Sequence, residues 1–170
     1  PNPEQAIELL IDATHRIISD CGLDPARNIG IGIAMPGPVG IAGPTGIAPG
    51  WENFDIVAAM SEKIDCPVFA ENDADAAAIS EKLYGNARTL ENFVYVFIGY
   101  GLGAGLFMDN QIIHGTNGAA GEIGHLPVEP HGRDCPCGRK GCLERYVSLL
   151  ALYDEFDAAD RDALLNDTTL

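Results

Sequence analysis

The chain has 170 residues, 46% hydrophobic and 21% charged, a composition typical of a globular protein rather than a disordered one. Its net charge of −15 opposes contact with phosphate backbones, so we expect no nucleic-acid binding by this part of the protein; alternatively, the acidity serves only solubility. No apolar run approaches the roughly 20 residues that span a bilayer, and the first residues do not resemble a signal peptide. We therefore expect no membrane contact and a cytoplasmic location.

Helices and strands are predicted to alternate in the first half of the chain. A helix is expected to begin at Pro3, because Asn2 and Gln5 have the spacing of a capping box, and to end at Cys21-Gly22. The elements expected after it are a buried strand (29–34), a loop rich in Gly and Pro (36–50), a helix (56–64), a strand (67–70) and a helix (72–85). This alternation is typical of a layered α/β fold.

The composition changes near residue 90, and we place a boundary between two lobes there, with residues 1–90 in one lobe and 91–170 in the other. The second lobe is expected to hold strands over 93–98 and 104–108, joined by a glycine-rich turn, then a turn at Asp109-Asn110 and a short apolar segment at 111–113. A helix is expected from Leu143 towards Phe156.

One histidine and three cysteines have the spacing of a metal site. His125 is followed by Cys135, Cys137 and Cys142, and one imidazole with three thiolates is a closed tetrahedral zinc set that leaves no position for a catalytic water. The alternative is a group of free, solvated thiols in a loop. The sequence favours structural zinc.

Polar residues stand where a predicted strand meets a predicted helix. Asp73 follows Glu71 and Asn72, and a carboxylate at the carboxyl end of a strand faces the crevice in which α/β sheets bind ligands. Asp73 could accept a proton from a substrate hydroxyl and Asn72 could hydrogen-bond sugar oxygens. Equally, Asp73 could only cap the helix.

Two further motifs lie in the second half. Glu122 and His125 are three residues apart, so both can face one cavity if their segment is helical, although Glu122 could also be a surface charge. The glycines Gly101, Gly103 and Gly105 would let backbone N–H groups approach an anion such as a phosphate, although glycines also build hairpins.

In this order, the motifs resemble the ROK family of sugar kinases and sugar-responsive repressors. The resemblance covers roughly residues 29 to 148. It rests on Glu71-Asn72-Asp73-Ala74, on Ile98-x-x-Gly101-Leu102-Gly103-x-Gly105-Leu106 with Gly115 and Gly121-x-x-Gly124-His125, and on Cys135-Pro136-Cys137-Gly138-Arg139-Lys140-Gly141-Cys142-Leu143-Glu144.

The resemblance implies an actin-like ATPase (ribonuclease H-like) α/β fold with two lobes, of which this chain would be a fragment without the N-terminal strands and the C-terminal end. It implies that Asp73 is the catalytic base and that the sugar is held by Asn72, Asp73, Glu122, His125, Glu144 and Gly37. His125 would use one ring nitrogen for zinc and the other for the sugar. The stretch 51–53 would join Gly37 in the opposite wall, and Gly101, Gly103 and Gly105 would form the phosphate loop.

The chain departs from the kinase pattern in several places. It has no Asp-x-Gly-Gly-Thr phosphate loop, Tyr100 stands where kinases usually have threonine, and Asp75 stands where the pattern has asparagine. Because a tyrosine ring would crowd the phosphate at that position, Tyr100 leads us to favour the effector-sensing region of a sugar-responsive transcriptional regulator that contacts DNA through another segment. The alternative is a hexose or N-acetylhexosamine kinase using ATP and Mg²⁺, and a sugar-binding protein with neither activity also stays open. The resemblance further implies a homodimer and a hexose, amino sugar or sugar phosphate as ligand.

Overall fold

The computed structural model describes residues 2–22, 24, 27, 29–37, 51 and 54–155. By their internal contacts, two compact units form, Pro1–Ala76 with His114–Ala119, and Ala77–Ile113 with Ala120–Leu170. The boundary between lobes near residue 90 stays a prediction about the whole protein. Among the helices of the described ranges, none has both the length and the apolar character needed to cross a membrane.

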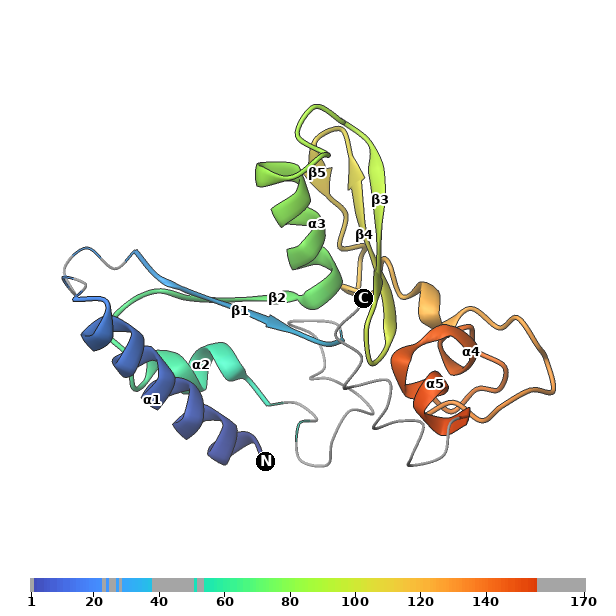
Figure 1. The fold of residues 1–170 in the computed structure, drawn as a ribbon, viewed down its shortest axis with the longest axis horizontal. Coiled ribbons are helices and arrows are strands. Elements are labelled where there is room, and N and C mark those ends of the chain that lie inside the picture. The colour runs from blue at the N-terminus through green and yellow to red at the C-terminus, as the bar shows by residue number, and fades with distance from the viewer. Residues whose placement is uncertain are drawn as a thin grey trace, which may run out of the picture. The chain divides into compact units, whose positions relative to one another are not determined.

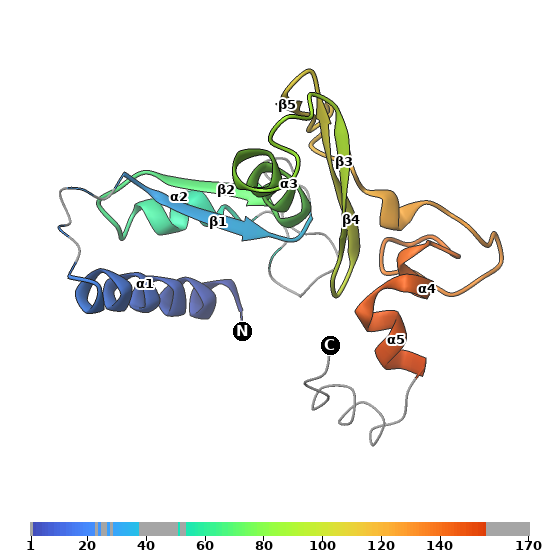
Figure 2. The same ribbon diagram turned by 45° about the horizontal axis from the view of Figure 1, so that its top comes forward.

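The first unit packs two helices on a two-stranded parallel sheet (Figures 1 and 2). Its elements are α1 (Pro3–Asp20), β1 (Ile31–Met35), α2 (Ile56–Ser61), β2 (Val68–Asn72) and the first turn of α3 (Asp73–Tyr84). The capping box predicted at the start of α1 is confirmed, because the Asn2 side chain accepts from the Gln5 amide at 2.9 Å and the Gln5 side chain accepts from the Asn2 amide at 3.2 Å. Burial of apolar side chains from all four complete elements holds the unit together; the buried members are Ile7, Met35, Ile56, Met60 and Val68.

The two strands differ from the prediction at their ends. β1 begins at Ile31 because Gly30 has a φ of 151°, which a strand residue does not adopt, and Ile29 before it is 91% exposed. β2 continues to Asn72, so α3 begins one residue later than expected, at Asp73. Since β1 and β2 are parallel, with Met35 opposite Asn72, their carboxyl ends lie at one edge of the sheet, beside the start of α3.

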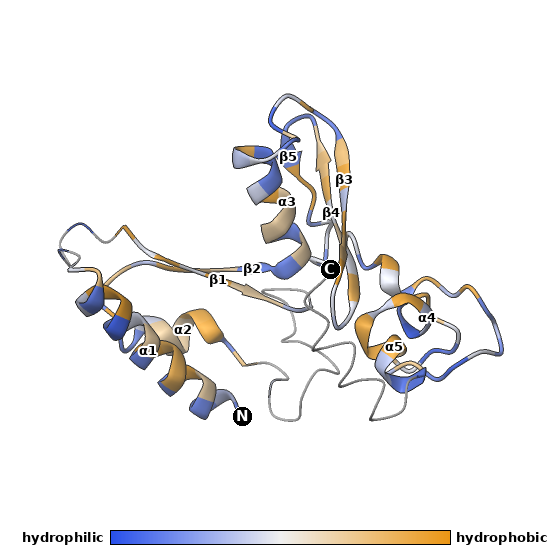
Figure 3. Cartoon of the chain, viewed as in Figure 1, coloured by the Kyte–Doolittle hydropathy of each residue, from blue (hydrophilic) through white to orange (hydrophobic). Residues whose placement is uncertain are grey.

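The second unit contains a three-stranded antiparallel sheet beside the later turns of α3 (Figures 1 and 2). Its strands, in sheet order, are β3 (Phe93–Ile98), β4 (Leu102–Met108) and β5 (Gln111–Ile112). β3 is hydrophobic along most of its length (Figure 3). The turn predicted at Asp109-Asn110 is confirmed, and the φ values of 50° and 62° are those of the tight turn that suits the twist of a hairpin.

The predicted start of the second strand in this unit is wrong. β4 begins at Leu102 and not at Ala104, so Gly103 and Gly105 lie inside the strand, opposite Phe97 and Tyr95, and the glycine-rich turn is shorter than expected.

The helix expected from Leu143 is two helices, α4 (Glu144–Val147) and α5 (Leu149–Glu155), separated at Ser148. Ser148 has an extended backbone, with a ψ of 162°, and its hydroxyl accepts from the Ala151 amide at 3.1 Å, which makes it the N-cap of α5. The expected end at Phe156 lies outside the described residues.

Candidate functional site

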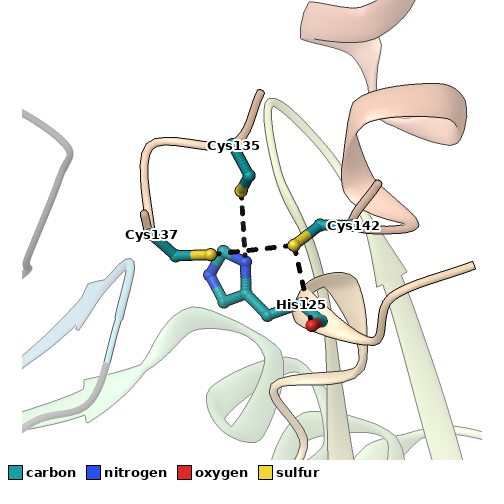
Figure 4. A group of neighbouring side chains, drawn as sticks. All are labelled: His125, Cys135, Cys137 and Cys142. Carbon is teal, nitrogen blue, oxygen red and sulfur yellow. Dashed lines mark hydrogen bonds between the residues drawn. The ribbon is translucent and has the colours of Figure 1, made fainter. Parts of the chain in front are cut away.

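The side chains of His125, Cys135, Cys137 and Cys142 point towards one another (Figure 4). His125 ends the 3₁₀ helix η2 (Ile123–His125), two cysteines lie in the following loop, and Cys142 precedes α4. His125 Nδ1 lies 3.6 Å from Cys135 Sγ, and Cys137 Sγ lies 3.7 Å from Cys142 Sγ. The four ligand atoms all lie within 4.8 Å of one another.

These separations fit a tetrahedral zinc ion. With Zn–S near 2.3 Å and Zn–N near 2.0–2.1 Å, two ligand atoms on a tetrahedron are about 3.8 Å apart for sulfur–sulfur and about 3.5 Å for nitrogen–sulfur. The loop geometry depends on glycine: Gly138 and Gly141 have φ values of 85° and 68°, and a Cβ at Gly141 would overlap the Glu129 carbonyl oxygen. The chain therefore forms a cluster that could hold a metal ion.

The three thiols of the cluster differ in acidity. Burial raises the pKa of Cys135 to about 12 and also raises the pKa of Cys142. Burial opposes ionisation at Cys137 as well, but the Arg139 amide and the neighbouring thiols outweigh it and lower the pKa of Cys137. Because metal binds thiolates, uptake of an ion must release protons, and acidification must favour its loss.

η2 lies directly against β4, and this packing needs glycine at two positions. The Gly121 carbonyl accepts from the Ala104 amide at 2.9 Å, and a Cβ at Gly121 or Gly124 would overlap the carbonyl oxygen of Ala104 or Leu102 respectively. Glu122 Oε2 lies 3.8 Å from His125 Nε2, so the two side chains approach each other, while their common cavity stays a prediction. The imidazole thus directs Nδ1 to the cysteines and Nε2 to a carboxylate.

Replacing Gly121 with alanine should destabilise the protein far more than replacing Gly138 with alanine. Both glycines have a φ of 85°, so both variants strain the backbone by the same mechanism, but only the Gly121 Cβ meets another atom, while nothing lies within 4 Å of a Cβ at Gly138. We expect thermal unfolding to show a loss of more than about 1 kcal/mol for Gly121→Ala beyond the Gly138→Ala control. Equal losses would contradict this packing.

Glu144, at the start of α4, reaches into the glycine-rich segment. Its Oε2 accepts from the Leu102 amide at 3.0 Å and would lie 2.7 Å from a Cβ at Gly101. Gly101 therefore leaves room for a carboxylate of the chain itself. One amide of the segment predicted to bind phosphate is already hydrogen-bonded to Glu144. The sequence did not indicate this contact, since the two residues are 42 positions apart.

Tyr100 lies at the tip of the β3–β4 hairpin. The residue is 73% exposed, and its ring stacks on Tyr153 of α5 with 6.4 Å between centroids. The ring is therefore held by an aromatic contact within the second unit.

In the first unit, Asn72 and not Asp73 caps α3. Asn72 Oδ1 accepts from the amides of Ala74 at 2.9 Å and Asp75 at 3.1 Å, and Asn72 Nδ2 donates to the Gly37 carbonyl at 3.1 Å. The amide side chain thus ties together the end of β2, the start of α3 and the turn after β1. The alternative interpretation of Asp73 as the cap is wrong, although Asp73 Oδ1 does accept from the Ala74 amide at 2.9 Å.

The Asp73 carboxyl is half-buried at the start of α3. Burial raises its pKa from the usual 3.8, against the opposing effect of hydrogen bonds from the Ala74 amide and its own amide. A carboxyl group with a raised pKa at a strand end has the chemistry of a proton acceptor for a ligand hydroxyl.

The predicted sugar residues are divided between the two units. Gly37, Asn72 and Asp73 lie together in the first unit, and Glu122, His125 and Glu144 lie in the second. Glu52 and Asn53, expected in the opposite wall, lie outside the described residues.

The sequence of this chain is similar to those of known proteins. The family model described as "ROK family" matches residues 1–168. The chain is 35% identical over 162 residues to a protein named xylose repressor from Bacillus subtilis, with 94% of this chain and 42% of the relative covered. It is also 35% identical over 157 residues to a glucokinase from Halalkalibacterium halodurans, with 89% of this chain and 45% of the relative covered. The chain therefore spans less than half the length of these relatives.

Among solved structures, the chain resembles a ROK family glucokinase from Streptomyces griseus in complex with glucose and AMPPNP. The TM-score is 0.68 at 30% sequence identity, and the match covers 94% of this chain and 51% of that chain. The mixed α/β architecture is thus that of part of the actin-like ATPase fold, as the resemblance predicted.

Proposed function

Because this chain belongs to the ROK family, we propose that it forms part of a sugar-binding protein whose ligand is a hexose, an amino sugar or a sugar phosphate. Because one relative is named xylose repressor, a pentose is a further candidate ligand. The observation that carries the proposal is the orientation of His125. Its Nδ1 faces three cysteines while its Nε2 lies 3.8 Å from Glu122, so a fixed ring and a carboxylate are presented together. Sugar hydroxyls, which both donate and accept hydrogen bonds, suit such a pair.

The proposed sugar contacts are Gly37, Asn72, Asp73, Glu122, His125 and Glu144. Asp73 would accept the proton of a sugar hydroxyl, supported by its half-buried carboxyl and raised pKa. Within the described part of the chain, Asn72 uses Oδ1 for the helix and one Nδ2 hydrogen for Gly37, and its second amide hydrogen could donate to a ligand.

We assign the cysteine cluster to structural zinc. Four protein ligands close the coordination sphere, so the ion would contribute folding free energy and no bound water for chemistry. Through Nδ1 it would also fix the tautomer and direction of the His125 ring, which is how a metal can support a neighbouring sugar site.

For the whole protein, we propose a sugar-responsive transcriptional regulator that contacts DNA through a segment other than this one. Similarity to xylose repressors supports it, as does Tyr100 at the position where kinases usually have threonine. The hydrogen bond from the Leu102 amide to Glu144 adds support, because that amide is engaged within the chain. The alternative is a hexose or amino-sugar kinase using ATP and Mg²⁺, which similarity to glucokinases supports. The homodimer implied by the family stays a prediction.

One set of assays on the full-length protein distinguishes the proposed regulator from the proposed kinase. For a regulator, saturating D-xylose or D-glucose should change affinity for its operator DNA by a factor of about 5–150, the usual range of allosteric coupling, with no sugar-dependent ATP hydrolysis. Sugar-dependent ATP hydrolysis with Mg²⁺, together with DNA affinity that sugar leaves unchanged, would contradict the regulator and establish the kinase.

A further inference from the structure

His114 joins the strand–helix junction to a segment far away in the sequence. It follows β5 after one residue, Ile113, and the segment His114–Ala119 belongs to the first unit although the residues on both sides belong to the second. The imidazole Nε2 lies 3.1 Å from Glu71 Oε2 and 3.9 Å from Asp75 Oδ2. The contact with Glu71 spans 43 positions of sequence.

Glu71 connects His114 to the proposed sugar residues. Its second oxygen, Oε1, accepts from the Asn72 amide at 2.9 Å, so one carboxylate connects the His114 ring to the backbone of Asn72. Asn72 in turn caps α3 and holds the Gly37 carbonyl, as described above. The path from His114 to the Asp73 backbone thus consists of two hydrogen bonds and one peptide unit.

Three acidic residues lie at this junction. Glu71, Asp73 and Asp75 lie within five residues, and Asp75 is only 4% exposed. The start of a helix supplies a partial positive charge, and His114 Nε2, within 3.9 Å of two of the carboxylates, can donate a hydrogen bond to Glu71. Asp75 adds a carboxylate at a position where the family pattern has an uncharged asparagine.

We propose that His114 is a positioning residue of the sugar site. Its ring orients Glu71, and Glu71 holds the backbone of Asn72 and Asp73 so that the Asp73 carboxyl meets the sugar hydroxyl. This inference rests on the proposed sugar-binding function. A partner that orients a binding group without touching the ligand commonly contributes about 10- to 100-fold to affinity in metal sites, and we expect the lower end of that range for this hydrogen-bonded pair.

The test is calorimetric titration of the full-length protein with D-glucose and D-xylose. His114→Ala should weaken affinity for the bound sugar by about 10-fold. His114→Gln should stay within about 3-fold of the wild type, because a side-chain amide can still donate to Glu71. The matched control is His15→Ala, since His15 is exposed on α1 in the same unit. Unchanged metal content and unfolding temperature would show that the effect is local.

Hydrogen exchange without sugar gives a second readout. His114→Ala should accelerate exchange of the amides of residues 72–74, and His114→Gln should not. If His114→Ala does not fold, Glu71→Ala removes the same hydrogen bond from the other side, and unchanged sugar affinity in that variant would overturn the inference.

The outcomes separate the two proposals. If the wild type binds neither sugar nor any other sugar tested, the proposed function fails and the inference falls with it. If the wild type binds sugar but His114→Ala has unchanged affinity, the inference alone fails. Equal losses in His114→Ala and His114→Gln would also overturn it, because the hydrogen bond to Glu71 would not be the cause.

Discussion

Replacing Cys142 with serine is expected to reduce bound zinc from one equivalent per chain to nearly none and to unfold the segment around residues 125–145. Cys142 is fully buried, and its Sγ lies 3.7 Å from both Cys137 Sγ and the His125 carbonyl oxygen. Structural zinc contributes an apparent 10–16 kcal/mol, roughly, in small zinc domains, so a loss of even a fraction should lower the unfolding temperature by about 10 °C or more.

The matched control is Cys21→Ser, because Cys21 is exposed at the end of α1 and lies outside the cluster. Metal analysis of protein purified without added zinc, combined with thermal unfolding, measures both effects. The same protein should release its metal on acidification, since protons compete for thiolates and burial raises the pKa of Cys135 and Cys142. A metal-free wild type that is as stable as the metal-treated protein would contradict the zinc assignment.

The second large effect is expected for Asp73→Asn. The change keeps the shape of the side chain but removes the proton acceptor, so sugar affinity should fall by about 10-fold or more, the size of one hydrogen bond to a charged group. If the full-length protein turns over ATP, that rate should fall by about 10²–10⁴-fold, because a general base acts mainly in the transition state. Asp20→Asn, at an exposed position at the end of α1, is the control.

Stability should respond to Asp73→Asn in the opposite direction from sugar affinity. Burial raises the pKa of Asp73, so the ionised carboxyl disfavours the folded state at neutral pH, and the variant should unfold at an equal or slightly higher temperature. The difference should shrink as the pH falls through the raised pKa and disappear below 3.8, where the carboxyl is protonated in both states. A marked loss of stability at pH 7 would instead indicate that Asp73 has a structural role.

Features set by neighbouring residues could be predicted from the sequence. The capping box of α1 depends on residues three apart, the hairpin turn on Asp109 and Asn110 themselves, and three of the four metal ligands lie within eight residues. In each case short chain segments fix the geometry, and the residue types leave few alternatives.

Contacts between distant segments could not be predicted. Nothing near Glu144 indicates that its carboxylate accepts from Leu102, and nothing near His114 indicates that its ring meets Glu71. Only the fold brings each of these pairs together.

Competing local interactions account for other errors. Asn72 and Asp73 can both cap a helix, and the choice of Asn72 accompanies its second hydrogen bond, to Gly37. Ser148 interrupts an apolar stretch that reads as one helix, because its hydroxyl begins a new one.

We propose that Asp73 and Glu122 each contact the bound sugar. Calorimetric titration of the full-length, zinc-loaded protein with D-glucose and D-xylose tests it most directly, in the wild type and in the Asp73→Asn and Glu122→Gln variants. We expect one sugar per chain in the wild type and an affinity weakened by about 10-fold or more in each variant. Sugar binding that either variant leaves unchanged, or no binding of any sugar by the wild type, would contradict the account.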